Sequence, residues 1–300
     1  MTGSEINVTA DLVRDLLREQ HPDLAELPIR EVAGGWGNQM WRLGDDLAIR
    51  MQRMDRSHDL QLKERRWLPL LASRVPIPIP TPVRSGAPSE RFPKIWTVMT
   101  WVPGTPMDQA QISRGDHAAD LLAAFLKALH VAAPAEAPDG SGSGFGAHPK
   151  ESTEGFEHFL RNVDLGDFAE HDVQAVWDDA VAAGEWRGPR VWVHGDLHPA
   201  NVVVADGTIA GIVDFGAVFA GDPAWDLAAA WVLLPAEGVS RFFDNYPPVD
   251  EATLRRARGL AAMKSLFLML MGQNGERGLP GGKPTWGPAG RAALDRVLKV

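Results

Sequence analysis

The stretch from residue 191 to residue 216 constrains this chain more than any other. Two short apolar runs rich in β-branched residues, which are typical of buried strands, each lead into a polar residue. They bring three oxygen-bearing side chains, Asp196, Asn201 and Asp214, within 19 positions of one another. Such a set predicts a functional site rather than ordinary surface.

Composition and charge narrow the class of protein. A chain of 300 residues with 45% hydrophobic content can bury a sizeable core, and the absence of cysteine excludes disulfides, thiolate metal sites and cysteine nucleophiles. The first ten residues lack the basic start and apolar core of a signal peptide, and no apolar run reaches the ~18 residues of a membrane span. We therefore expect a cytoplasmic protein without a membrane partner. The net charge of -9 argues against nucleic acid as a partner, because phosphate binding needs a basic face.

The acidic charge is concentrated in the second part of the chain. Residues 1–104 carry 14 Lys and Arg against 13 Asp and Glu, a balance of +1, whereas residues 105–300 carry 16 against 26, a balance of -10. A negative surface attracts cationic ligands, although the same charge also keeps a protein in solution. The distribution favours a ligand that carries positive charge.

The first 104 residues predict an antiparallel sheet with helices, ended by a hinge at Pro103-Gly104. The sheet would begin as a meander, because turn sequences separate its first three strand-like segments. The predicted strands are 29–33, 39–43, 47–51 and 94–102, and the predicted helices are one capped by Thr9 and one over 57–73.

Residues 105–300 predict a mainly helical domain around the central stretch. A Gly- and Ser-rich segment within 132–150 has the composition of a loop. The predicted helices cover 113–131, 153–163, 168–183, 222–234, 238–246, 250–272 and 287–298.

The spacing of the polar residues is that of a phosphoryl-transfer site. In a kinase catalytic loop, an Asp that faces the acceptor hydroxyl is followed five residues later by an Asn that turns to the metal, and Asp196 and Asn201 have this spacing. Asp214-Phe215-Gly216 has the form of the metal-binding Asp on the neighbouring turn. Because Mg²⁺ prefers oxygen ligands and keeps some water, one carboxylate, one amide oxygen and nucleotide phosphates suffice to bind it.

Together these motifs resemble the aminoglycoside phosphotransferase family, small-molecule kinases with a protein-kinase-like fold. The resemblance rests on His-Gly-Asp-Leu-His-Pro-Ala-Asn at 194–201, Ile-Val-Asp-Phe-Gly at 212–216 and Gly-Asp-Pro-Ala-Trp-Asp-Leu-Ala at 221–228. The order of predicted strands and helices extends it over nearly the whole chain. It implies an α+β fold of two lobes: an antiparallel, nucleotide-binding lobe at 1–104, and a helical lobe at 105–300 with the catalytic loop, metal site and acceptor pocket.

The resemblance also implies roles for single residues. Asp196 would be the catalytic base, and Asn201 and Asp214 would be the Mg²⁺ ligands. Glu64 would pair with a cation on the third strand, where this chain has Arg50 and many relatives have Lys.

Arg50 is the main departure from the family pattern. Arg is permanently charged, planar and bidentate, so we expect Arg50 to hold the α- and β-phosphates of the nucleotide. In the alternative, Arg50 faces solvent and Lys63 takes over.

Two further segments of the first lobe are expected to contact the nucleotide. Gly35 and Gly37 lie ahead of Arg50 in a short glycine pattern that would cover the phosphates, although a hairpin turn explains this pattern equally well. Met99 and Trp101 belong to a segment that would bind adenine through its backbone groups. These side chains leave ATP and GTP both open as donors.

Three residues are expected to support the catalytic loop. For His194 and His198 we favour hydrogen bonds that shape the loop over a metal or acid–base role, since the metal set is complete without them. Asp226 lies on an apolar helix, where an unpaired carboxylate would be costly, so we expect it to accept hydrogen bonds from the loop backbone.

The sequence therefore predicts a Mg²⁺-dependent phosphotransferase that moves the γ-phosphate of ATP, or of GTP, to a hydroxyl group of a small molecule. The acidic second lobe favours an aminoglycoside-type antibiotic as acceptor, and resistance as the role. The alternative acceptors are a macrolide or a metabolite such as choline, homoserine or a sugar. A catalytically silent nucleotide-binding protein is the alternative of a different class. The chain is compatible with a monomer or a dimer.

Overall fold

The protein, seen as a computed structural model, is described for residues 8–32, 38–53, 57–140 and 146–299. It divides into two compact units. Unit 1 comprises Met1–Ser73 and Pro78–Val102, and unit 2 comprises Arg74–Ile77 and Pro103–Val300. The boundary between Val102 and Pro103 falls at the Pro-Gly sequence that reads as a hinge.

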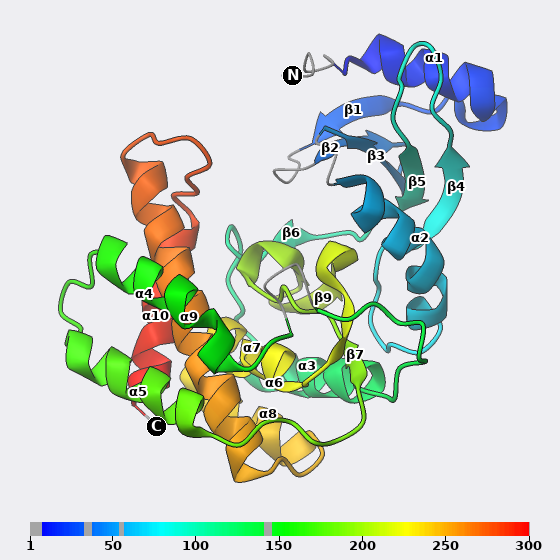
Figure 1. Ribbon diagram of the computed structural model, residues 1–300. Helices are drawn as coiled ribbons and strands as arrows, with labels where there is room; N and C mark the ends of the chain where they lie inside the picture. The colour runs from blue at the N-terminus through cyan, green and yellow to red at the C-terminus, as the bar shows by residue number, and fades with distance from the viewer. Residues whose placement is uncertain (1–7, 33–37, 54–56, 141–145, 300) are drawn as a thin grey trace. The chain divides into compact units, whose positions relative to one another are not determined.

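Unit 1 is built on a five-stranded antiparallel sheet with the order β1-β2-β3-β5-β4 (Figure 1). The strands are β1 Ile29–Val32, β2 Asn38–Leu43, β3 Leu47–Gln52, β4 Pro82–Gly86 and β5 Trp96–Thr100. The first three strands form the predicted meander. β4 is not predicted from the sequence. It begins at a proline, and its short run Pro-Val-Arg-Ser-Gly lacks the alternation of apolar and polar residues that is typical of a strand.

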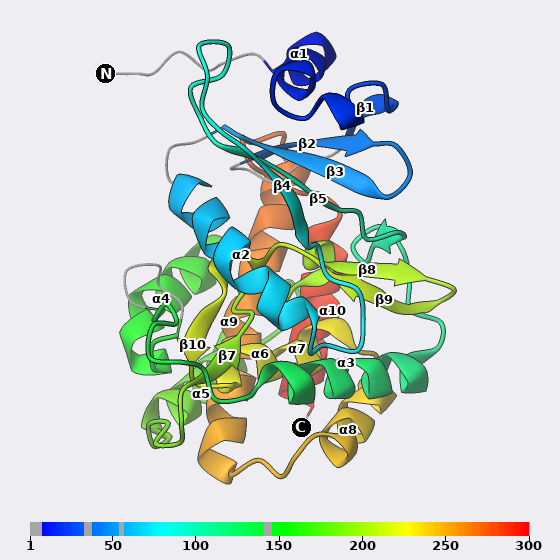
Figure 2. The same ribbon diagram turned by 90° about the vertical axis from the view of Figure 1, so that its right-hand side faces the viewer.

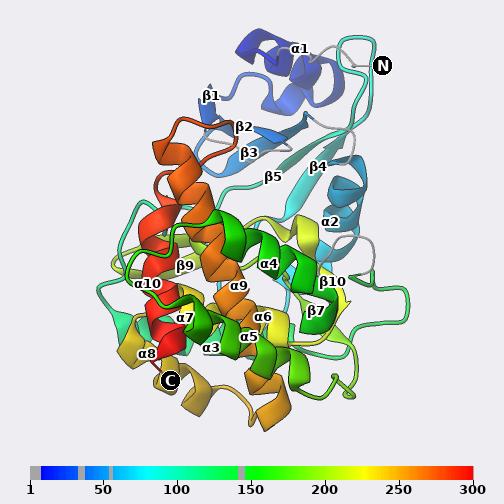
Figure 3. The same ribbon diagram turned by 60° about the vertical axis from the view of Figure 1, so that its left-hand side comes forward.

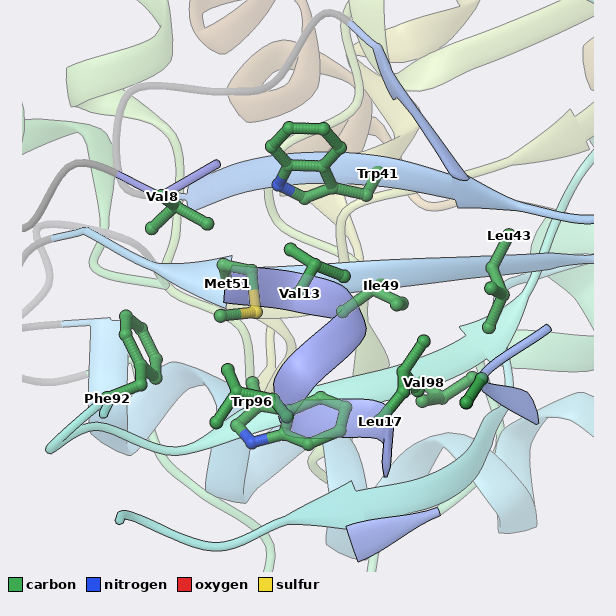
Figure 4. Close-up of a cluster of buried hydrophobic side chains, with 12 residues drawn as sticks. Val8, Val13, Leu17, Trp41, Leu43, Ile49, Met51, Phe92, Trp96 and Val98 are labelled. Atoms are coloured by element: carbon green, nitrogen blue, oxygen red, sulfur yellow. The ribbon is translucent and has the colours of Figure 1, made fainter. Parts of the chain in front are cut away.

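One face of this sheet is apolar and packs against α1 (Ala10–Gln20), whose N-cap is Thr9. Successive side chains of a strand point to opposite faces, so alternating residues of β2, β3 and β5 contribute to this core. Its buried members, several of them drawn in Figure 4, include Val13, Leu16 and Leu17 of α1 and Trp41, Leu43, Ile49, Met51, Trp96 and Val98 of the sheet.

The other face of the sheet is polar. Asn38, Arg50 and Thr97 lie on it, and side chains of α2 (Ser57–Ala72) are hydrogen-bonded to all three. The sheet of unit 1 therefore separates a hydrophobic core from a buried polar layer.

Unit 2 contains two small antiparallel sheets around the central stretch (Figure 2). β7 (Val191–Val193) pairs with β10 (Phe219–Gly221), and β6 (Thr105–Pro106) pairs with the hairpin of β8 (Val202–Ala205) and β9 (Thr208–Ile212). α3 (Gly115–Leu129) packs against the hairpin and against α8 (Ala236–Asn245).

The helices of unit 2 gather along α9 (Glu251–Glu276), the longest helix of the described chain (Figure 3). α4 (Thr153–Asn162), α5 (Glu170–Ala182) and α10 (Trp286–Leu298) contact it. The close approach of α5 requires Gly259, because a Cβ there would lie 2.2 Å from Ala180 Cβ. α9 thereby provides a rigid scaffold for the segments around it.

The helix predicted over 222–234 is two short helices, α6 (Ala224–Leu227) and α7 (Ala229–Leu233). They meet at Ala228, where the Trp231 N–H bonds to a carbonyl three residues back instead of four. Within the described ranges, every helix is too short or too polar to cross a bilayer.

Candidate active site

The loop of residues 194–201 begins at the end of β7 and is fixed by one buried carboxylate. Asp226 Oδ2 accepts a hydrogen bond from the His194 N–H at 2.7 Å, and Oδ1 accepts one from the Gly195 N–H at 2.9 Å. Gly195 has a φ of +83°, and a Cβ there would lie 2.8 Å from the Phe219 ring, which restricts this position to glycine. The start of the loop is therefore held through its backbone.

Asp226 is itself supported by the ends of α3 and α8. His130 Nε2 lies 3.2 Å from Asp226 Oδ2, and His130 Nδ1 shares a hydrogen bond of 2.6 Å with the Tyr246 hydroxyl. Burial raises the pKa of Asp226, but the hydrogen bond and charge of His130, together with the Gly195 N–H, bring it below its ordinary value. Asp226 is thus an ionised, fully bonded anchor.

Asp196 lies within the loop and remains accessible, with 34% of its side chain exposed. Asn201 Nδ2 donates to the backbone carbonyl of Asp196 at 2.9 Å and to its Oδ2 at 3.3 Å. Burial raises the pKa of the Asp196 carboxyl, against the attraction of Lys264 and the hydrogen bond from Asn201. An oriented carboxylate with a raised pKa is suited to accept a proton from a hydroxyl group.

Both histidines of the loop accept hydrogen bonds from its backbone. His194 Nδ1 accepts from the Asp196 N–H at 3.2 Å, and His194 Nε2 lies 3.1 Å from the Val213 carbonyl. His198 Nδ1 accepts from the N–H two residues ahead and caps the 3₁₀ turn Pro199–Asn201. Burial lowers the pKa of His198 to about 3 and also lowers that of His194, so both rings are neutral near pH 7. Their observed contacts shape the loop.

Lys264 of α9 supports the loop from outside the motif. Its Nζ donates a hydrogen bond of 3.0 Å to the carbonyl of Leu197, the residue after Asp196. Burial lowers the pKa of Lys264, while the charges of Asp196 and Asp226 oppose this change. Lys264 therefore holds the loop backbone at the residue that follows the candidate base.

The hairpin of β8 and β9 brings Asn201 and Asp214 to one end. Val202 pairs with Ile212, and the Val213 N–H donates to the Asn201 carbonyl at 2.9 Å, so Asp214 comes one residue after the position opposite Asn201. Asp214 has left-handed backbone angles, φ 60° and ψ 71°. Such a conformation costs a non-glycine residue about 1–3 kcal/mol and is typical of functional sites.

The side chains at this end of the hairpin fit Mg²⁺. The Nδ2 of Asn201 donates to Asp196, which directs its amide oxygen the other way, and Asp214 adds an exposed carboxylate. Both are hard oxygen donors. Among residues 8–32, 38–53, 57–140 and 146–299, no three His, Cys, Asp or Glu side chains are grouped so as to hold a metal ion. A metal ion here would take further ligands from phosphate oxygens and water.

In unit 1, Arg50 of β3 pairs with Glu64 of α2. Their side chains are 8% and 3% exposed, and Arg50 Nη1 donates to Glu64 Oε2. The alternative in which Arg50 faces solvent and Lys63 replaces it does not fit this burial.

For the other residues that we expect to contact the nucleotide, the structure gives fewer contacts that bear on this role. Met99 is buried in β5, and the Trp101 N–H donates to the Asp46 carbonyl at 2.7 Å. Because this N–H is engaged within unit 1, adenine recognition by the 99–102 segment would depend on its other backbone groups. Gly35 and Gly37 lie outside the described residues.

Sequence reasoning misses four side chains that support these groups: His130, Tyr246 and Lys264 of unit 2 and Asn38 of unit 1. Lys264 has a signal, since it is the one charged residue between 259 and 275 of an apolar helix. Tyr246 is the single tyrosine of the chain, but nothing local connects it to His130. Asn38 follows a glycine-rich sequence and belongs to no motif.

Comparison with known proteins gives matches of two kinds. A sequence model described as "Phosphotransferase enzyme family" matches residues 28–260. The aminoglycoside 3'-phosphotransferases of Escherichia coli and Salmonella typhimurium are each 28% identical over 163 residues, which is 50% of this chain and 58% of the relative. The chain thus spans less than two thirds of the length of these curated relatives.

Solved structures match over almost the whole chain. The GDP complex of wild-type aminoglycoside 2'-phosphotransferase-IIIa has a TM-score of 0.66 at 18% identity, covering 96% of this chain and 97% of that chain. Macrolide 2'-phosphotransferase type I has a TM-score of 0.61 at 18% identity, covering 96% of this chain and 98% of that chain. At such identities the likeness shows the fold, and it confirms the predicted fold class.

Proposed function

Because the chain belongs to the phosphotransferase enzyme family, we propose that it transfers the γ-phosphoryl group of a nucleoside triphosphate, preferably ATP, to a hydroxyl group of a small molecule. The geometry of the 194–201 loop carries this proposal. Asn201 orients an accessible Asp196, and Asp226 and Lys264 fix the backbone on both sides of it. This is the arrangement that a positioned base requires.

Asp196 acts on the acceptor. Its carboxylate accepts a hydrogen bond from the acceptor hydroxyl and takes the proton as the hydroxyl oxygen bonds to the γ-phosphorus. The bond from this phosphorus to the β–γ bridging oxygen breaks, and the nucleoside diphosphate leaves with that oxygen. Burial raises the pKa of Asp196, which makes its carboxylate a better proton acceptor.

Asn201 and Asp214 would hold Mg²⁺, which when bound neutralises charge on the phosphates. Asn201 connects the two halves of the site, since its Nδ2 donates to Asp196 while its amide oxygen is directed to the metal side. Base and metal are then oriented by one amide group.

Unit 1 would supply the nucleotide contacts. Arg50, paired with Glu64, holds the α- and β-phosphates, and the 99–102 segment contacts adenine. By the sequence pattern alone, Gly35 and Gly37 would cover the phosphates. In this account residues 1–104 bind the nucleotide and residues 105–300 carry the catalytic loop and the acceptor.

An aminoglycoside-type antibiotic is the acceptor that the charge distribution supports best. Residues 105–300 carry 26 acidic against 16 basic residues, and the curated relatives are named for aminoglycosides. A polycation is attracted by such a surface. A cytoplasmic enzyme of antibiotic resistance is the role that follows.

A macrolide is the second candidate, and an aromatic row beside the loop favours it. The His198 and Trp286 rings lie 4.7 Å apart, Trp286 and Phe267 lie 6.0 Å apart, and Phe267 and Phe159 lie 5.5 Å apart. Phe159 and Phe267 are half-buried, so part of the row is open to an apolar acceptor.

The test is transfer by the purified protein with Mg²⁺ and either ATP or GTP. Aminoglycosides, macrolides and metabolite alcohols are each incubated and examined for a mass increase of one phosphate. We expect phosphorylation of an aminoglycoside with ATP, and a KM for the acceptor that rises with salt because screening weakens charge attraction. A salt-independent KM for a macrolide would favour the second candidate. Nucleotide binding without transfer to any acceptor would indicate a silent protein and contradict the proposal.

A further inference from the structure

Five polar side chains are buried between the sheet and α2 of unit 1. They come from three neighbouring strands and from the helix, and together they form a polar layer in a place where proteins usually bury apolar groups. Their exposed fractions are 7% for Asn38, 7% for Arg50, 1% for Gln61, 3% for Glu64 and 2% for Thr97.

The strand register explains why these residues meet. Arg50 stands opposite Met40 of β2 and opposite Thr97 of β5. Asn38 precedes Met40 by two positions, so its side chain lies on the same face as Arg50. Gln61 and Glu64 are three residues apart on α2, which places them on one side of the helix, toward the strands.

The guanidinium of Arg50 is held on two sides. Nη1 donates to Glu64 Oε2. When the Asn38 amide presents its oxygen, this atom accepts from Arg50 Nη2 at 2.8 Å and from Nε at 3.0 Å. This orientation is required because a guanidinium has only donors, and the opposite one would set the amide N–H₂ against them.

Asn38 is in turn supported from the helix. With its oxygen toward Arg50, Asn38 sets its N–H₂ 3.0 Å from the Gln61 amide, and this contact is a hydrogen bond when Gln61 presents its oxygen there. The N–H₂ of Gln61 then donates to Thr97 Oγ1, 3.2 Å away. Arg65 Nε donates to the same Thr97 oxygen at 2.9 Å. The position of Asn38 is therefore determined by the sheet and the helix together.

The contact between Asn38 and Arg50 uses an edge that lysine does not have. A guanidinium carries five N–H donors in a fixed plane, and its Nε and Nη2 form one edge of that plane. An ammonium group carries its three donors on one nitrogen and cannot present two coplanar N–H groups to the Asn38 oxygen as Nε and Nη2 do.

We propose that Asn38 is a positioning residue for Arg50, which it holds by the Nε edge so that the guanidinium meets the phosphates of the nucleoside triphosphate. This inference rests on the proposed function, because the phosphates are the partner that Arg50 is oriented to receive. It also accounts for an Arg at a position where lysine would leave the Asn38 oxygen without its two donors.

A double-mutant cycle tests the proposal. The variants are Asn38→Leu, Arg50→Lys and the combination of both, and the measurement is the Kd of the Mg²⁺-nucleotide at a temperature where circular dichroism shows all of them folded. We expect Asn38→Leu alone to raise the Kd about tenfold, the effect of losing one charge-assisted hydrogen bond. In the Arg50→Lys background the same change should alter the Kd less than about twofold, because the edge that Asn38 holds is already absent.

Gln39→Leu is the matched control. Gln39 is the next residue of β2, is buried to the same degree, and bonds to the Val8 carbonyl and to Glu31 on the other face of the sheet. It should lower stability as Asn38→Leu does while leaving the nucleotide Kd near the wild-type value. If Asn38→Leu does not fold, Gln61→Met replaces it in the cycle, with an expected rise in Kd of about threefold.

Each outcome decides the question. Coupling between positions 38 and 50, with an unaffected control, supports the positioning role. Independent effects of the two substitutions, or an equal loss of binding in Gln39→Leu, would overturn it while leaving the proposed function intact. A wild-type protein that binds no Mg²⁺-nucleotide would overturn the proposed function and this inference with it.

Discussion

The two units position their candidate functional groups in different ways. In unit 2 the buried Asp226 holds the catalytic loop, and in unit 1 buried side chains hold Arg50. Asp226 accepts hydrogen bonds from the backbone N–H groups of two consecutive loop residues. Arg50 is held by the side chains of Glu64 and Asn38, which come from two other elements. A backbone N–H group is present whichever side chain a residue has. The contacts of Arg50, in contrast, require specific side chains at the positions of Glu64 and Asn38. The position of the loop start therefore does not depend on the loop's own side chains, whereas the position of the Arg50 guanidinium depends on two matched side chains.

Asp226→Asn should have the largest effect on stability and should test the backbone half of this comparison. The amide keeps the shape but turns a donor toward N–H groups that need acceptors, and it leaves a buried bond to His130 unmatched. We expect a loss of about 3 kcal/mol in the free energy of unfolding. Transfer should also fall at least tenfold, because the loop start is no longer fixed.

Asp222→Asn is the control for this variant. Asp222 is also buried, but its side chain pairs with Arg256 and accepts a hydrogen bond from the Ala224 N–H, and both of these partners lie outside the loop. It should lower the unfolding free energy, measured by urea denaturation, and keep kcat within about twofold, since catalytic geometry is unchanged. Equal losses of kcat in both variants would show that Asp226 acts only through general stability.

Lys264→Met tests whether a side chain outside the sequence motif is needed to position the catalytic loop. It removes a charged donor to the Leu197 carbonyl while keeping a long apolar stem. We expect kcat to fall about tenfold or more, as for the loss of a charged hydrogen bond, with little change in the nucleotide KM. Lys264→Arg should recover part of the loss.

The control cation on the same helix is Arg255, which pairs with Asp179 near the surface. Arg255→Met should leave steady-state kinetics unchanged. If Lys264→Met behaves like Arg255→Met, then the loop is held by Asp226 alone.

Tyr246→Phe should have the smallest effect. It deletes only the hydroxyl that bonds to His130 and preserves the ring stack on Phe242, whose centroid lies 5.6 Å away. We expect a loss of about 1 kcal/mol in unfolding free energy and a kcat within about twofold of wild type. A tenfold loss of kcat would mean that the support of Asp226 extends as far as α8.

The difference between the contacts of Asp226 and those of Arg50 also explains which features could be predicted from the sequence. The strands of the meander, the helices of unit 2 and the spacing of Asp196, Asn201 and Asp214 follow from local patterns. Asp226 lies on an apolar run, and because a buried carboxylate needs hydrogen-bond donors, the sequence predicts that it bonds to the loop.

What could not be predicted depends on tertiary contacts. Asn38 reaches Arg50 only because the register of β2 and β3 sets them on one face, and a register shift of one residue would separate them. Lys264 lies 67 positions from the carbonyl that it bonds. β4 and the break between α6 and α7 likewise arise from packing rather than from propensity.

The role of Asp196 is the central claim, and Asp196→Asn tests it most directly. The amide retains the size and one acceptor but takes up no proton, so the turnover of the acceptor identified by mass should fall ~10²–10⁴-fold. The Kd of the Mg²⁺-nucleotide should stay within about twofold of wild type, because the nucleotide contacts are unchanged. Asp206→Asn, in the exposed turn at the other end of the same hairpin, should match wild type in both. Transfer by Asp196→Asn at a rate close to that of Asp206→Asn would contradict the account.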